Sequence, residues 1–90
     1  MARGIPWAGA NRQLGPPEGM DESQVDSLHV FPNGKQCVSC WQFDAEELAE
    51  IARTGCVFVS VWFGDTQPPI YIGSEANVRQ LCADYGVWKA

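Results

Sequence analysis

Basic residues are scarce in this chain, which has six Lys and Arg against eleven Asp and Glu and a formal net charge of -5 at pH 7. Neutralisation of phosphates by Lys and Arg supplies much of the affinity of proteins for nucleic acid. This charge balance argues against nucleic acid as a direct partner. It favours a partner protein with a basic surface.

Long apolar runs are also missing. No run approaches the roughly 20 residues that a membrane-spanning helix needs. The first seven residues, from Met1 to Trp7, lack the apolar stretch of a signal peptide. We therefore expect a cytoplasmic protein that makes no contact with a membrane.

The common signatures of catalysis are absent. His29 is the only histidine, and the predicted strand that contains it, Leu28–Phe31, has no nucleophile or carboxylate. General acid-base catalysis would need such a group next to the histidine. Ser60 lacks the Gly-x-Ser-x-Gly turn of a hydrolase nucleophile, so a core hydroxyl is the better interpretation. There is no glycine-rich phosphate loop. We expect a protein that is not an enzyme and needs no cofactor.

Four cysteines are the candidate metal ligands: Cys37, Cys40, Cys56 and Cys82. The spacing of Cys37 and Cys40 resembles a zinc knuckle. Residues three apart on a straight strand point to opposite faces, however, and a second close pair is missing. We expect small buried thiols and no metal, with a structural zinc-binding module as an alternative.

The residues that are present predict one small domain with an N-terminal extension. Hydrophobic residues make up 46% of the chain and include four tryptophans, a composition typical of a globular protein. Frequent Gly and Pro predict an irregular arm over residues 1–27, followed by a compact α+β domain over residues 28–90. Trp7, Leu14, Met20 and Val25 could dock the arm onto this body, and Trp88 could fold back onto the core.

The body begins with a predicted hairpin. Two β-rich runs, Leu28–Phe31 and Gln36–Trp41, flank the pair Asn33 and Gly34, which favours a two-residue turn. In that register Val30 faces Cys37.

Two more strands are predicted further along the chain. Cys56–Phe63 is short, rich in β-branched and aromatic residues, and bounded by Gly55 and Gly64. It predicts a central strand that is covered on both faces. Ile70–Ile72 follows two prolines and predicts a short edge strand.

Two helices are predicted. Asp44 as N-cap, Glu47 as its capping-box partner and Gly55 as the stop predict a helix over Ala45–Thr54. Ser74 can cap a second helix that ends at Gly86. The order ββαββα predicts an α+β fold, with two helices on one face of a small antiparallel sheet of about four strands.

Six short motifs are spaced along the chain: Pro17-Glu18-Gly19, Ser39-Cys40-Trp41, Glu46-Glu47-Leu48, Thr54-Gly55, Val59-Ser60-Val61 and Gln67-Pro68-Pro69. Together they resemble a family of short uncharacterised proteins encoded by tailed bacteriophages and prophages. The resemblance covers about residues 6 to 72. It implies a phage context, and hence the cytoplasm of a bacterial host, but no defined activity or functional residue.

Acidic and aromatic side chains are the predicted partner-binding residues: Glu46, Glu47, Glu50, Tyr71 and Trp88. We therefore expect a small phage accessory protein that binds a host or phage protein without catalysis. Such binding could inhibit a host or antiviral defence protein, as anti-CRISPR proteins do. A minor virion or assembly protein is an alternative, and an open sheet edge would also allow a homodimer.

Overall fold

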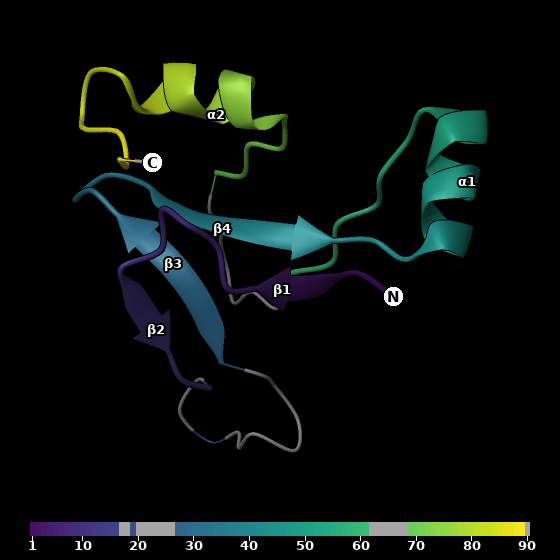
Figure 1. Cartoon of the computed structure of the whole chain (residues 1–90), viewed down its shortest axis with the longest axis horizontal. Coiled ribbons are helices and arrows are strands. Elements are labelled where there is room, and N and C mark those ends of the chain that lie inside the picture. The colour runs from purple at the N-terminus through teal and green to yellow at the C-terminus, as the bar shows by residue number, and fades with distance from the viewer. Residues whose placement is uncertain (17–18, 20–26, 62–68, 90) are drawn as a thin grey trace.

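Six elements make up the regular structure in a computed structural model that describes residues 1–16, 19, 27–61 and 69–89. Four strands form one antiparallel sheet in the order β1-β4-β3-β2, shown in Figure 1. This architecture confirms the predicted α+β class. The elements are β1 (Arg3–Ile5), β2 (Arg12–Leu14), β3 (Leu28–Pro32), β4 (Cys37–Gln42), α1 (Ala45–Thr54) and α2 (Glu75–Cys82).

The order of the elements is not the predicted ββαββα. Within the described residues all four strands precede both helices, and two of the strands lie in the N-terminal arm. Residues 1–27 are therefore not irregular throughout. Three-residue strands form in the arm, with Gly4 inside β1, because β1 pairs with β4 and β2 pairs with β3.

The two strands predicted in the second half of the chain are not formed in the described residues. Cys56–Val61 and Ile70–Ile72 have no regular secondary structure. Trp62, Phe63 and residues 64–68, which lead to the second predicted strand, lie outside the described residues. The β-forming composition of 56–61 is real, but a strand needs a neighbour, and the arm strands occupy both sides of the β3-β4 hairpin.

The hairpin is confirmed, but its register differs by two residues. Val30 lies opposite Ser39 instead of Cys37, because the loop contains four residues and not two. The Asn33 side-chain oxygen accepts hydrogen bonds from the backbone N–H of Lys35 (3.0 Å) and Gln36 (2.8 Å), and this wider loop replaces the two-residue turn. A shift of two keeps every side chain on its predicted face.

Both helices begin where the capping residues predict. Asp44 and Glu47 form the full capping box of α1, and Gly55 ends that helix with a φ of 71°. Ser74 caps α2 through the backbone N–H of Asn77. The helix ends at Cys82 and not at the predicted Gly86, because residues 83–85 form a turn. In the part of the chain that is described, no helix is long and apolar enough to cross a membrane.

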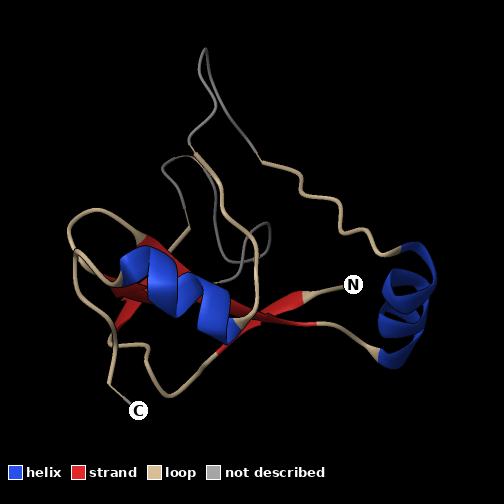
Figure 2. Ribbon diagram, turned by 90° about the horizontal axis from the view of Figure 1, so that it is seen from above, coloured by secondary structure: helices blue, strands red, loops and turns tan. Residues whose placement is uncertain are grey.

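The two helices do not cover one face of the sheet together. Hydrogen bonds from Gln36 to the Leu81 carbonyl (2.9 Å) and from Asn33 to the Gly86 carbonyl (3.0 Å) tie α2 and its following turn to the hairpin loop. Figure 2 shows α1 standing apart at the opposite end of the molecule. No residue of α1 is buried, so the prediction was wrong for this helix.

The core sits where the N-terminal arm meets the C-terminal residues. Trp88 is only 6% exposed, and the rings of Trp7 and Phe31 pack edge-on against it with centroids at 5.1 and 5.9 Å. The Arg79 guanidinium lies over the same ring at 4.5 Å. Trp7 also donates a hydrogen bond to the His29 carbonyl at 3.0 Å. Docking of Trp7 and folding back of Trp88 are thus confirmed.

Gly9 is the position where the rings leave no room, and it supplies a test of this core. A Cβ atom there would lie 2.3 Å from Cδ1 of Trp88 and 2.5 Å from Cζ3 of Trp7. We predict that Gly9→Ala lowers the free energy of unfolding by about 1–3 kcal/mol, the usual cost of overpacking a core. Urea unfolding followed by tryptophan fluorescence measures this change.

Gly15→Ala is the matched control, because a Cβ atom there meets nothing within 4 Å. It should leave stability unchanged or raise it slightly by restricting the unfolded chain. Equal stabilities for the two variants would contradict the packing of Trp7 and Trp88 around Gly9.

Candidate functional site

Helix α1 exposes acidic and apolar side chains together. Glu46 is exposed, and the side chain of Glu50 is 70% exposed and only 3.8 Å from the equally exposed Arg53. Leu48 is 55% exposed, although the helical spacing of Leu48 and Ile51 is that of a face that packs on a core. The helix therefore offers an apolar stripe bordered by carboxylates.

The start of α1 is held by a small network of charges. The Asp44 carboxylate accepts a hydrogen bond from the Glu47 backbone N–H at 2.8 Å, and Glu47 in turn accepts one from the Asp44 backbone N–H at 3.3 Å. The amino group of Met1 lies 3.0 Å from Asp44 and 3.1 Å from Glu47. These contacts raise the pKa of that amino group, chiefly through its hydrogen bonds to Asp44 and Glu47.

Glu47 differs from the other two glutamates of the predicted site. Its side chain is 30% exposed and is engaged in the capping box and in the contact with Met1. Glu46 and Glu50 make neither of these contacts in the described structure. The most exposed carboxylates of α1 are therefore those of Glu46 and Glu50.

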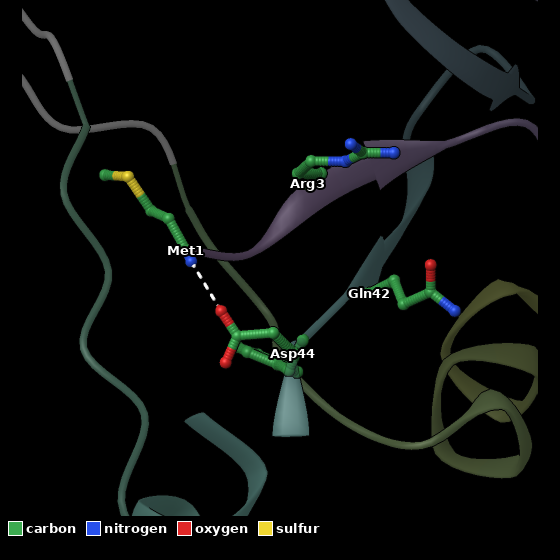
Figure 3. Close-up of a pocket in the computed structure, with 5 residues that line it drawn as sticks. Met1, Arg3, Gln42 and Asp44 are labelled. Atoms are coloured by element: carbon green, nitrogen blue, oxygen red, sulfur yellow. Dashed lines mark hydrogen bonds and ion pairs between the residues drawn. The ribbon is translucent and has the colours of Figure 1, made fainter. Parts of the chain in front are cut away.

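An open hollow of about 510 Å³ lies beside this network. Figure 3 shows the Met1 amino group directed at the Asp44 carboxylate, with Arg3 on β1 and Gln42 at the end of β4 nearby. The lining residues are Met1, Arg3, Gln42, Phe43 and Asp44. None of them is a Ser, Cys or His, so the described lining of the hollow offers no nucleophile and base in the usual combinations.

The two aromatic residues of the predicted site lie away from α1. Tyr71 is 67% exposed, but it belongs to the segment that leads into α2, which both Figure 1 and Figure 2 place far from α1. Trp88 is buried under Trp7 and Phe31. The folded structure uses Trp88 as a core residue, so it is not available to a partner and its prediction as a surface residue is corrected.

The cysteines do not come together. Cys82 is buried, Cys40 is half-buried, and Cys37 and Cys56 are exposed. The expectation of buried thiols therefore holds for Cys82 and fails for Cys37 and Cys56. In the described ranges, no group of three or more His, Cys, Asp or Glu side chains is placed to hold a metal ion.

No sequence signal predicts the apolar surface that follows α1. Val57, Phe58 and Val59 were predicted at the centre of the sheet, but they are 42%, 95% and 50% exposed. An apolar run predicts burial without saying what covers it. This segment is therefore a second exposed apolar stretch, next to α1 in the sequence.

Comparisons of the chain with protein-family models, with curated proteins and with solved structures found no match.

The charge on Asp44 makes the start of α1 sensitive to pH. The Glu47 backbone N–H and the Met1 amino group lower the pKa of Asp44 below its usual 3.8. The ionised carboxylate therefore stabilises α1 above pH 3.8, and this contribution is lost as the pH falls through the lowered pKa. We predict that the NMR chemical shifts of residues 45–54 lose helical character below pH 3.8.

Asp44→Asn supplies the control for this prediction. The amide oxygen still caps the helix but does not titrate in this range. Helicity of α1 in Asp44→Asn should therefore vary less with pH than in the wild type. If both proteins lose α1 helicity over the same acidic pH range, the loss is caused by titration of groups other than Asp44.

Proposed function

We propose that this protein acts without catalysis, by binding another protein through helix α1. The observation that carries the proposal is that α1 has no buried residue, although its sequence is that of an amphipathic helix. A helix with an apolar stripe is normally stabilised by packing that stripe against something. A partner protein would supply the missing contact.

The side chains of α1 indicate the chemistry of such a partner. Leu48 and Ile51 are spaced as anchors of a helix that docks in an apolar groove. Glu46 and Glu50 border this stripe and would face the rim of the groove. Lys or Arg on that rim would favour rapid and selective association. The partner we propose is therefore a protein with an apolar groove and a basic rim.

The resemblance to phage and prophage proteins suggests the setting for this interaction. In that setting the partner is a host or phage protein, and occupation of its groove would block whatever normally binds there. Inhibition of a host or antiviral defence protein is the form of this function that we propose. The net charge of -5 is consistent with a basic protein partner.

A charge-reversed variant tests this proposal. We predict that tagged wild-type protein retains one protein from a bacterial host lysate in a fixed ratio, and that Glu46→Lys/Glu50→Lys loses it. The variant keeps Asp44 and Glu47, so the start of α1 stays capped. Mass spectrometry identifies the retained protein, and titration calorimetry with the purified partner should show affinity reduced by at least about tenfold.

Two controls separate the surface of α1 from other effects. Asp21→Lys/Glu22→Lys makes the same change in net charge elsewhere in the sequence and should bind as the wild type does. Leu48→Ser changes no charge and should weaken binding if the apolar stripe enters the groove. Unchanged binding by the α1 variants, or equal loss in the Asp21/Glu22 variant, would contradict docking through α1.

A further inference from the structure

The segment that follows α1 has the composition of a strand but pairs with no strand among the residues that the structure describes. In Cys56–Val61, Phe58 is 95% exposed and Val59 is 50% exposed. Within the described part of the chain, the backbone groups of residues 57–61 form no hydrogen bond. The segment contains no charged residue and no proline. Such a sequence readily adds to the edge of a sheet.

The molecule is also too open for its size. Its accessible surface is 7344 Å², whereas a compact chain of 9.9 kDa is expected to expose about 5,200 Å². The radius of gyration of 14.2 Å likewise exceeds the roughly 12 Å typical of 90 residues. The excess surface of about 2,100 Å² is in the range that one chain buries in an obligate dimer, about 1,000–2,500 Å².

A receptive edge lies at the same end of the molecule as the segment. Strand β1 is a terminal strand of the sheet and pairs only with β4 among the described strands. The Met1 amino group is 3.0 Å from Asp44, the cap of α1, so the start of β1 lies close to the start of α1. Figure 1 and Figure 2 both show the N-terminus, which leads into β1, on the side of the sheet that faces α1. The other terminal strand, β2, lies further away.

We propose that a second copy of this chain covers the segment. Two copies related by a two-fold axis near this end of the molecule would each add Cys56–Val61 to the other copy's β1, along the edge where no described strand pairs. The exchange is reciprocal, as a two-fold interface requires. It pairs the backbone groups of the segment and of β1, and it buries Phe58 and Val59 between the copies. The product is a closed homodimer.

This inference does not depend on the proposed function. The dimer uses the segment after α1, whereas Glu46 and Glu50 remain outside the strand pairing. Glu46→Lys/Glu50→Lys should therefore remain dimeric. A monomer that still binds its host partner would contradict the dimer and leave the proposed function standing. A dimer that binds no host partner would contradict the proposed function and leave the dimer standing.

The experiment measures two properties of the full chain, its molar mass in solution and the hydrogen exchange of its backbone amides. At micromolar concentration, light scattering after size exclusion should give twice the chain mass of 9.9 kDa. The amides of residues 57–61, which have no partner in the described single chain, should be protected from exchange. Protection of these amides should decrease on dilution below the dimer dissociation constant.

Val59→Pro removes a backbone N–H in the middle of the pairing segment and should raise the dimer dissociation constant by at least about tenfold. Val59→Thr keeps that N–H and the β-branched shape, and it should remain largely dimeric. Near-ultraviolet circular dichroism checks that the Trp7 and Trp88 packing survives in both variants. A monomeric wild type, free exchange of residues 57–61 in a dimer, or growth into larger assemblies would overturn the proposed dimer.

Discussion

The contact of Trp7 with Trp88 is the constraint on which the rest of this structure depends. It joins the arm before the hairpin to the residues after α2, and Gly9 permits the close approach because it has no side chain. The strands alone bury little, since Val30, Cys82 and Trp88 are the buried apolar residues among those described. Trp88 also accepts the Arg79 guanidinium on its ring and at its carbonyl oxygen. One ring thus connects the sheet, the arm and α2.

The parts of the fold that follow from short-range interactions could be predicted from the sequence. Asp44, Glu47 and Gly55 set both ends of α1 because a capping box and a left-handed C-cap involve only neighbouring residues. The position of the hairpin is also predictable, because its turn depends on neighbouring residues. Its loop is two residues longer than predicted, because the Asn33 side chain accepts hydrogen bonds from the backbone N–H groups of Lys35 and Gln36. The strands were harder to assign because pairing is decided between distant segments. Three-residue strands in the arm gained partners, and the more apolar Cys56–Val61 did not.

In the candidate site, too, the features set by neighbouring residues were predictable and those set by distant segments were not. Exposure of Glu46 and Glu50 follows from their places on an amphipathic helix, so it was predictable. The burial of Trp88 and the exposure of Phe58 were not, because an aromatic ring stabilises a core and an interface by the same loss of contact with water. Only the position of the ring relative to other elements decides between the two. No residue pattern within either segment contained that information.

The span of the Trp7 and Trp88 contact has a kinetic consequence. It joins residues near opposite limits of the described chain, so closing it costs more chain entropy than closing the hairpin or starting α1. Contacts of such long range slow folding. Local structure around Asn33 and Asp44 can form while the core is still open. Closure of the core does not cover Cys56–Val61, because Phe58 is still 95% exposed in the folded chain. This segment therefore stays accessible to other unfinished chains before and after the core closes.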